Sequence, residues 1–585
     1  MKRQYQLLSL AAIVLAAYYP SSQAGVARVD DVQLFQFLGS AGKISWKDVL
    51  LPAQHGGYYY RPIIVSSFLL DRSVLGLLPG LMHMENILLH VLNSILVYFL
   101  TLHALRSEER ARTWAPLASG LLFGLHPIAT ESVNWISGRT DVLAASFVLL
   151  SALMLLIFRE RRRPIALGMA LACFLCAVLT KETLLAFLPG FALILTAKRE
   201  DATDLQASSG IVQRRRALFF PAIGLVGVAL MPFVLRYFAF RSNTGRVGLT
   251  ILAIKTDWIH SMFVVLRAFG FYLKKLIVPI PLNFAILEVD PLYEIVAVPL
   301  VALCIYVALR RTVRSAVFAA GICLILPAFI PAFSQIAWTP YAERYIYVAS
   351  SFLVIASVLY VQDIVRPRRV ALVAAVVLIA MMVTTFLRCN VWKDDFLLVQ
   401  DTVEKSPLSR PMRGLYAAML AEKGEYDRAL VQVEAGSRLP YGGEYDAKFD
   451  VTKAYVYAMQ GKYKEAERLY RYILLRVPDK ASAVLPNLIT LQNIKLRGET
   501  LASERMSIEG QRLRYNIELY MVTRDPYLLY KIGNDAIGMK RFDAALNFYR
   551  DVLPGLSDTD PRKAVIKKRI GALESRMGHA HGKIS

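Results

Sequence analysis

Long apolar runs fill the first two thirds of the chain, and they limit its fold more than any other feature. They recur from residue 1 to residue 388, whereas from Trp392 onward charged residues return every few positions. A run of about 20 apolar residues crosses the hydrocarbon of a bilayer as a helix. With 56% hydrophobic residues in a length of 585, the chain is too apolar for a soluble protein of this size. The predicted fold class is all-α, with a polytopic membrane domain followed by a soluble helical domain.

The apolar runs predict about eleven transmembrane helices, judged by the length that a membrane helix needs. The expected crossings are at residues 6–19, 84–105, 114–127, 142–158, 164–180, 183–197, 217–236, 294–309, 315–332, 346–363 and 370–387. Segment 258–278 is also apolar, but a twelfth crossing would place two downstream basic loops outside. We therefore expect this segment to be interfacial or re-entrant, with Lys274 and Lys275 snorkelling to the headgroups.

Clusters of Lys and Arg follow many of the apolar runs and set the expected orientation. Lys and Arg number 68 against 45 Asp and Glu, a formal net charge of +23. Because much of this excess lies in short loops, it indicates cytoplasmic loops rather than a nucleic-acid partner. The N-terminus, with Lys2 and Arg3, is then cytoplasmic, and an odd number of crossings places the two ends of the chain on opposite sides of the membrane. The C-terminal domain is expected outside a multi-pass inner (plasma) membrane, in a periplasmic or extracellular position.

Two further stretches bear on the membrane topology. Lys2 and Arg3, the apolar run behind them and Ser-Ser-Gln-Ala at 21–24 also resemble a cleavable signal peptide. Under either interpretation, residue 25 onward reaches the outer side. Residues 199–213 are polar and rich in small side chains, which predicts a mobile cytoplasmic loop.

Three stretches near the C-terminus share one spacing and predict helix-pair repeats. In each, an aromatic residue precedes an alanine by three positions: Tyr426 and Ala429, Tyr463 and Ala466, Phe542 and Ala545. The middle copy, with Ala466, Tyr470 and Pro478, is typical of a tetratricopeptide repeat. Such repeats hold a protein or peptide in a groove, or they form a scaffold that caps the membrane domain. The expected domains are a membrane domain at 1–388, a connecting segment at 389–412, tetratricopeptide-like repeats at 413–570 and a tail at 571–585.

Ionisable residues beside the apolar runs are expected to gather at the outer membrane surface. They are Asp30, Asp31, Arg61, His126, Glu131, Arg139, Asp141, Lys181, Glu182, Glu343 and Arg344, followed by Tyr345. Each one alone is explained by a solvated helix end or a headgroup anchor. Together they suit a reaction in which a carboxylate deprotonates an acceptor hydroxyl while Arg and Lys stabilise a departing phosphate.

That combination favours glycosyl transfer from a lipid phosphate. Phosphate is a good leaving group, so one carboxylate base suffices, and attack opposite to it inverts the anomeric configuration. A transporter fits less well, because its substrate site lies near the bilayer midplane on broken helices.

Several motifs resemble one known family. They are Asp30-Asp31, Tyr60-Arg61-Pro62, His126-Pro-Ile-Ala-Thr-Glu131, Trp135-Ile-Ser-Gly-Arg139-Thr-Asp141, Lys181-Glu182, Ala342-Glu343-Arg344-Tyr345-Ile-Tyr347 and Trp392-Lys-Asp. In this order they resemble the transmembrane and tetratricopeptide repeat-containing O-mannosyltransferases and their bacterial relatives. That family belongs to the C superfamily of membrane glycosyltransferases, which use polyprenyl-phosphate sugars.

The resemblance implies a role for each group of residues. Asp30 or Asp31 would be the catalytic carboxylate, and Arg344, Lys181 and Tyr345 would contact the lipid phosphate. The sugar and acceptor site would then be shaped by Arg61, His126, Glu131, Arg139, Asp141, Glu182 and Glu343. The expected partners are a polyprenyl-phosphate-linked sugar as co-substrate, an exported protein acceptor that the repeats hold, and membrane lipids.

Some alternatives stay open from the sequence. Some members of the superfamily bind a divalent metal through carboxylates and others need none, and no clear ligand set is present here, so no metal site is assigned. The sugar, mannose or another hexose, is not defined. The acceptor could instead be a lipid or a glycan, and a non-catalytic repeat scaffold for envelope assembly is a further hypothesis.

Overall fold

A computed structural model describes most of the chain as helices that form two compact units, residues 1–406 and 407–585. The described residues are 2–40, 49, 60–105, 114–198, 211–240, 257–334, 339–364, 367–440, 444–497, 502–556 and 560–581. The expected cytoplasmic loop at 199–213 lies outside these ranges up to residue 210, and helix α11 begins at Ile211. The predicted all-α fold class is confirmed, since no β-strand is present within the described ranges.

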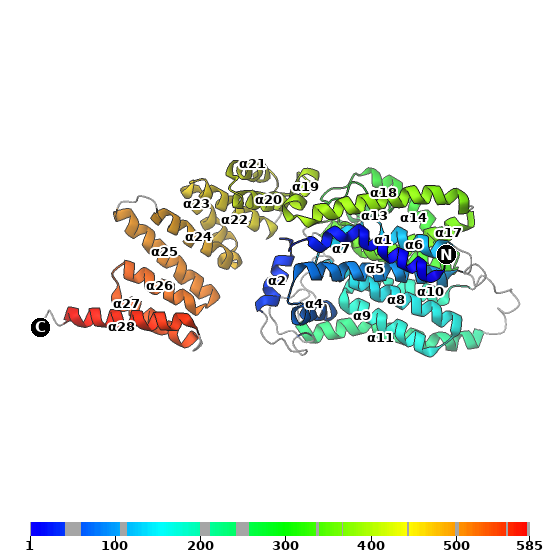
Figure 1. The fold of residues 1–585 in the computed structure, drawn as a ribbon, viewed down its shortest axis with the longest axis horizontal. Helices are drawn as coiled ribbons and strands as arrows, with labels where there is room; N and C mark the ends of the chain where they lie inside the picture. The colour runs from blue at the N-terminus through cyan, green and yellow to red at the C-terminus, as the bar shows by residue number, and fades with distance from the viewer. Residues whose placement is uncertain are drawn as a thin grey trace. The chain divides into compact units, whose positions relative to one another are not determined.

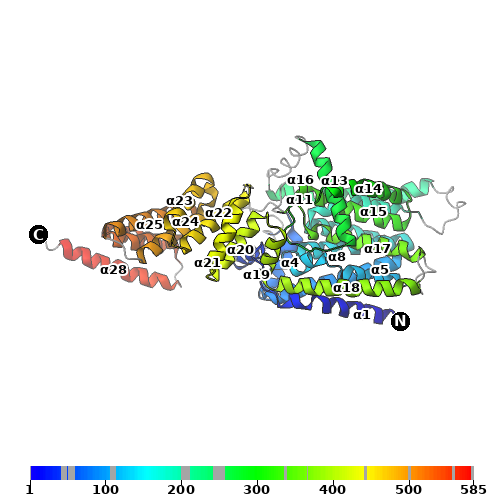
Figure 2. The same ribbon diagram turned by 90° about the horizontal axis from the view of Figure 1, so that it is seen from above.

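The first unit is a bundle of long helices, whose axes share one general direction in Figure 1 and Figure 2. Its helices are α1 (Arg3–Tyr18), η1 (Tyr19–Gln23), α2 (Asp31–Ser40), α4 (Pro62–Val74), α5 (Pro79–Ala104), α6 (Ala115–Gly124), α7 (Ala129–Asn134), α8 (Arg139–Arg161), α9 (Pro164–Thr180), η2 (Glu182–Ala186), α10 (Phe187–Thr196), α11 (Ile211–Phe240), α13 (Trp258–Ile277), α14 (Leu292–Leu309), α15 (Val313–Ile325), η4 (Leu326–Phe329), α16 (Ile330–Ser334), η5 (Glu343–Ile346), α17 (Tyr347–Ile364), α18 (Pro367–Lys393) and α19 (Asp395–Lys405).

Seven helical stretches of the described chain are long and apolar enough to cross a membrane. They are Pro79–Ala104, Arg139–Arg161, Pro221–Phe238, Leu292–Leu309, Val313–Phe333, Glu343–Ile364 and Leu372–Lys393. Each of the other four expected crossings coincides with a shorter helix: α1, α6, α9 and the η2–α10 stretch. The chain is therefore a multi-pass membrane protein, and the further crossings beyond seven stay a prediction. Helix α13, in the segment predicted to be interfacial, is not among the seven.

A stripe of buried polar side chains on α5 holds the centre of the bundle together. His83, Asn86, His90 and Asn93 are spaced three or four residues apart, so they share one helix face. The His90 Nε2–H donates to the Gly124 carbonyl at the end of α6, over 3.0 Å, and the other ring nitrogen lies 2.7 Å from the Tyr347 hydroxyl of α17. Inside a membrane such hydrogen bonds join helices that hydrophobic burial alone does not hold.

The second unit consists of consecutive antiparallel helix pairs. Its helices are α20 (Arg410–Glu422), α21 (Tyr426–Ser437), α22 (Glu444–Met459), α23 (Tyr463–Arg476), η6 (Pro478–Lys480), α24 (Ala481–Arg497), α25 (Ala502–Thr523), α26 (Pro526–Gly538), α27 (Phe542–Val552), η7 (Leu553–Gly555) and α28 (Pro561–His581). The repeat alanines Ala429, Ala466 and Ala545 are fully buried between paired helices, as the spacing predicts. Helix α28 continues to residue 581, beyond the predicted end of the repeats at 570.

The turns inside the repeats explain the pattern of glycines. Gly424 and Gly461 adopt left-handed backbone angles, with φ of 81° and 78°. Lys540 stands at the same position of its repeat and keeps this conformation, with φ of 58°. Because a side chain there costs roughly 1 kcal/mol or more, the third repeat retains the turn geometry without the residue that suits it.

Candidate functional site

Residues 126–141 form an almost wholly buried segment between helices α6 and α8, and most of the predicted site residues belong to it or contact it. The segment contains the short helix α7 and a loop that enters α8 through Gly138. A side-chain Cβ at Gly138 would lie only 2.4 Å from the Ser132 carbonyl oxygen, so the loop closes this tightly only with glycine.

The guanidinium group of Arg139 fastens this loop to its neighbours. Its Nη1 forms an ion pair with Asp71 of α4, and its Nη2 lies 2.8 Å from a carboxylate oxygen of Glu85 on α5. Its Nε donates to the Asn86 side chain over 3.0 Å. The Arg139 side chain is only 1% exposed, and its guanidinium stacks 4.8 Å from the ring of Phe68. Arg139 thus joins the start of α8 to α4 and α5, and its guanidinium group lies apart from solvent.

The same loop binds Asp31, at the start of α2. The backbone N–H of Ser137 donates to Asp31 Oδ1 over 2.9 Å, and the Ser137 hydroxyl donates to the same oxygen over 2.5 Å. The other carboxylate oxygen, Oδ2, is buried and has no hydrogen-bond partner. Burial raises the pKa of Asp31 to about 7, despite the opposing effect of the Ser137 hydrogen bonds.

The neighbouring Asp30 points elsewhere, because its backbone is left-handed, with φ of 63°. Asp tolerates this conformation better than most residues do. The turn buries the side chain of Asp31 fully and leaves Asp30 exposed. The two adjacent carboxylates, which sequence alone left equivalent, therefore occupy different environments.

Glu131 and Arg344 form a second contact of the buried segment. Arg344 Nη1 pairs with Glu131 Oε1, and the Arg344 backbone N–H donates to Glu131 Oε2 over 2.9 Å. The guanidinium carbon lies 5.2 Å from the ring of Trp135 and 4.8 Å from that of Tyr345. Arg344 is held in one orientation by a carboxylate and two aromatic rings.

Two more ion pairs lie near helix ends: one joins the start of α8 to the end of α9, and the other involves the residue just before α4. The Lys181 ammonium contacts the Asp141 carboxylate, and Lys181 keeps 16% of its side chain exposed. Arg61 binds Glu182 through two parallel hydrogen bonds of 2.8 and 2.7 Å. Since Lys181 and Glu182 are consecutive, the two pairs are neighbours, and they are more accessible than Arg139.

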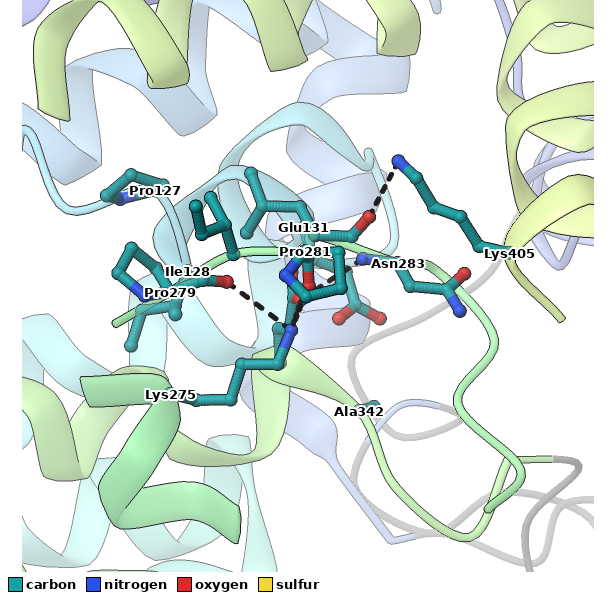
Figure 3. Close-up of polar contacts among 12 residues, drawn as sticks. Pro127, Ile128, Glu131, Lys275, Pro279, Pro281, Asn283, Ala342 and Lys405 are labelled. Atoms are coloured by element: carbon teal, nitrogen blue, oxygen red, sulfur yellow. Dashed lines mark hydrogen bonds and ion pairs between the residues drawn. The ribbon is translucent and has the colours of Figure 1, made fainter. Parts of the chain in front are cut away.

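Glu343 is fully enclosed by a lysine and a loop. Lys275 Nζ lies 2.7 Å from Glu343 Oε1, and the Asn283 backbone N–H donates to the same oxygen over 3.1 Å. Figure 3 shows the Lys275 ammonium directed at the oxygen atoms of the 279–283 loop, where it also donates to the carbonyls of Pro279 and Pro281. The prediction that Lys275 snorkels to the headgroups is wrong, because this lysine is 3% exposed and neutralises a buried carboxylate.

His126 also has both ring nitrogens in use. Its Nε2–H donates to the Leu276 carbonyl over 3.0 Å, and the Ile128 backbone N–H approaches Nδ1 to 3.4 Å. This ring is neutral and attaches the buried segment to the end of α13.

Among the described residues, one buried carboxylate differs from the others because no Lys or Arg pairs with it. Seven Asp and Glu residues are buried in the described chain, and six of them form an ion pair with Lys or Arg. The pairs are Asp71 with Arg139, Glu131 with Arg344, Asp141 with Lys181, Glu343 with Lys275, Asp450 with Arg410 and Asp535 with Arg512. Among the described residues, Asp31 is the buried carboxylate that lacks a cation.

Sequence reasoning missed three charged members of this cluster: Asp71, Glu85 and Lys275. A signal for the first two was present, because each is an isolated carboxylate inside an apolar stretch, where charge is costly. In the described part of the chain, no group of three or more His, Cys, Asp and Glu side chains is arranged to hold a metal ion.

The fold and the site define a multi-pass membrane protein with a C-terminal helical-repeat region and a buried carboxylate beside several ion pairs. No protein-family model matches the chain. Part of it is similar to known proteins: it is 33% identical over 140 residues to protein O-mannosyl-transferase TMTC1 of Mus musculus, covering 21% of this chain and 14% of that protein. It is 38% identical over 136 residues to Tmtc2 of Drosophila melanogaster, covering 22% and 14%.

A third relative is protein O-mannosyl-transferase TMTC2 of Homo sapiens, 38% identical over 101 residues, which is 17% of this chain and 12% of that protein. The resemblance to the transmembrane and tetratricopeptide repeat-containing O-mannosyltransferases is thereby confirmed over part of the chain. The match spans well under two thirds of the length of each of these relatives.

The Arg139 cluster generates a stability prediction. Arg139→Leu leaves Asp71 and Glu85 without their cation, so we expect a loss of about 3–5 kcal/mol. The control Arg61→Leu removes a cation from the more accessible Arg61–Glu182 pair, so it should cost clearly less than Arg139→Leu. Thermal unfolding of the purified proteins in detergent measures both. Equal midpoints for the two variants would contradict the anchoring role of Arg139.

Proposed function

We propose that the chain is an inverting glycosyltransferase that moves a sugar from a polyprenyl phosphate to a hydroxyl group of an exported protein. The observation that carries the proposal is Asp31, the buried carboxylate without a cation partner among the described residues. Its pKa of about 7 is close to the optimum for a general base at neutral pH. The names of the similar O-mannosyl-transferases support a protein acceptor and mannose, or another hexose, as the sugar.

The proposed step forms one bond and breaks one. A Ser or Thr hydroxyl oxygen attacks the anomeric carbon, the bond from that carbon to the phosphate oxygen breaks, and the phosphate leaves with the electron pair. The hydroxyl proton passes to Asp31, whose Oδ2 has no other partner. Attack on the face opposite the phosphate inverts the configuration, and a single carboxylate is sufficient because the leaving group needs no acid.

The cations of the site suit the departing phosphate. Lys181 and Arg344 are held by Asp141 and Glu131, which fixes their positions before a donor binds. Preorganised cations stabilise developing negative charge without reorienting during the reaction. Tyr345 supports the Arg344 guanidinium by stacking against it.

Four other predicted residues fall into two groups according to the solvent exposure of their side chains. Arg61 and Glu182 are partly exposed and are proposed to contact the sugar or the acceptor. Arg139 and Glu343 are buried and fully paired, so they are proposed to position the 126–141 segment and Arg344. Metal dependence stays unassigned.

We further propose that the N-terminus is cytoplasmic and that the repeats lie on the outer side, in a periplasmic or extracellular position near the acceptor path. The support is the distribution of Lys and Arg over the short loops. This arrangement places Asp31 on the side where exported proteins are found.

The base assignment predicts a loss of transfer without a loss of folding. Asp31→Asn keeps an acceptor oxygen for Ser137 but cannot take a proton, so transfer should fall by about 10²- to 10⁴-fold. Asp290→Asn is the matched control: Asp290 is exposed, and Asn can still accept its hydrogen bond from the Leu292 backbone N–H. Glycoproteomics of exported proteins, at equal levels of membrane-inserted enzyme, reads out both variants.

The outcome separates the hypotheses. Loss of a defined Ser- or Thr-linked glycan in Asp31→Asn alone supports the proposed enzyme. An unchanged glycoproteome in all variants would argue against a protein acceptor and leave lipid or glycan transfer and the scaffold hypothesis to be tested with those acceptors.

The raised pKa of Asp31 predicts an acid limb in the pH profile. The base form is lost as the pH falls through about 7, so kcat/KM should drop about tenfold per pH unit well below that value. The stability effect has the opposite sense: the folded pKa exceeds the unfolded one, so the Asp31 contribution to stability is lost as the pH rises towards 7. Asp31→Asn should therefore be at least as stable as the wild type at pH 8. A flat rate profile between pH 5 and 8 would contradict the assignment.

The orientation is tested by cysteine labelling in a variant without the native cysteines. An impermeant maleimide added outside should label Pro440→Cys, in the second unit, and should spare Lys2→Cys at the N-terminus. The reverse pattern would invert the proposed topology.

A further inference from the structure

A cavity of about 480 Å³ opens beside the segment that leads to Asp31. Four parts of the first unit surround it: the stretch after η1, the start of α5, the end of α7 and the turn between α18 and α19. Its lining includes Val26, Ala27, His83, Asn134 and Trp392. The proposed transfer step does not use His83, Asn134 or Trp392.

One side chain of this lining has an unpartnered polar atom although it is more than nine-tenths buried. Trp392 is 5% exposed, and its indole N–H has no hydrogen-bond partner. His83 is 2% exposed; its Nε2–H donates to the Gly25 carbonyl over 2.9 Å, and its ring also interacts with the Asn134 backbone. Buried polar atoms are normally satisfied, so the indole N–H of Trp392 points to a bound group that accepts a hydrogen bond.

The backbone at one edge of the cavity also has free capacity. Ala24 is extended, with φ of −73° and ψ of 151°, and residues 24–27 belong to no helix. The Val26 peptide group forms no hydrogen bond with another described residue. A peptide group whose N–H and C=O are unused can form main-chain hydrogen bonds with a second, extended chain.

This edge is held directly against the proposed base. The Ala27 peptide N–H interacts with the Asp31 carboxyl group, and Ala27 also lines the cavity. The backbone N–H of Arg28 donates to Asp395 over 3.3 Å, and the indole N–H of Trp135 donates to the Val29 carbonyl over 3.1 Å. A chain lying along residues 24–27 would therefore pass beside Asp31.

We propose that this cavity is the acceptor subsite, where an extended polypeptide segment binds next to the hydroxyl residue that receives the sugar. The assignment rests on the proposed function and names the part of the chain that selects its substrate. A phosphate is a poor occupant, because the wall carries the two carboxylates of Asp394 and Asp395 against the single cation of Lys393. A polypeptide segment presents alternating N–H and C=O groups, which match both the Val26 peptide group and the indole N–H of Trp392.

The test measures peptide transfer and acceptor-independent donor hydrolysis on the purified full-length enzyme. The probe is a synthetic peptide copied from a site that the wild type glycosylates. Asn390 is exposed at the rim, so Asn390→Trp fills the cavity without disturbing the core. We expect the peptide KM to rise at least tenfold with donor hydrolysis unchanged. Asn390→Ala and Phe386→Trp, which adds an indole one turn earlier on α18 and outside the cavity lining, should keep the wild-type KM.

A second variant tests the unpartnered indole group. Trp392→Phe retains an aromatic ring and removes the N–H, and it should raise the peptide KM about three- to tenfold while donor hydrolysis stays constant. An unchanged peptide KM in both Asn390→Trp and Trp392→Phe would overturn the subsite while leaving the glycosyltransferase in place. Absence of both transfer and donor hydrolysis in the wild type would overturn the proposed function, and the subsite with it.

Discussion

The rest of the site depends on the buried ion-pair cluster of Arg139. A guanidinium group that is only 1% exposed inside a membrane domain is stable only when its charge is neutralised and its N–H groups are hydrogen-bonded. Asp71 and Glu85 provide the opposite charge, and Asn86 accepts a hydrogen bond. The cluster joins α4 and α5 to the first turn of α8, and so it fixes the loop that ends at Gly138. That loop supplies both Ser137 donors to Asp31. The position of Asp31 therefore depends on a cation, Arg139, that is itself buried and fully paired.

Two other carboxylates of the 126–141 segment also form ion pairs with cations far away in the sequence. Glu131 holds Arg344 from a loop more than two hundred residues later, and Asp141 holds Lys181 at the end of α9. In each pair, the attraction between the two charges offsets part of the free-energy cost of burying them. The geometry is fixed because breaking either pair would leave a buried charge without a partner. The segment thus joins residues distant in sequence into one buried framework, which also carries the Ser137 donors to Asp31.

The sequence predicted the all-α class, the positions of seven membrane-length helices and the repeat spacing, because apolar periodicity and length carry that information locally. It also singled out residues that the structure pairs with one another, such as Glu131 with Arg344, since ionisable residues in apolar surroundings are few. It could not distinguish Asp30 from Asp31, because the difference arises from one left-handed backbone angle and from Ser137, over a hundred residues away. The prediction for Lys275 failed because its partner is also distant in the sequence. A lysine next to prolines resembles a headgroup anchor, and only the folded structure brings Glu343 into contact with it.

Charge balance distinguishes Asp31 from the other buried carboxylates of the first unit. Among the described residues of that unit, Asp71, Glu131, Asp141 and Glu343 each have a Lys or Arg partner, and Asp31 has none. The hydrogen bonds to Asp31 come from Ser137, a neutral residue, and burial acts against the charged form of Asp31, so its pKa rises to about 7. The four ion pairs hold their cations in place, while Asp31 is left able to exchange a proton near neutral pH. One compact region therefore contains both a fixed electrostatic frame and a titrating carboxyl group.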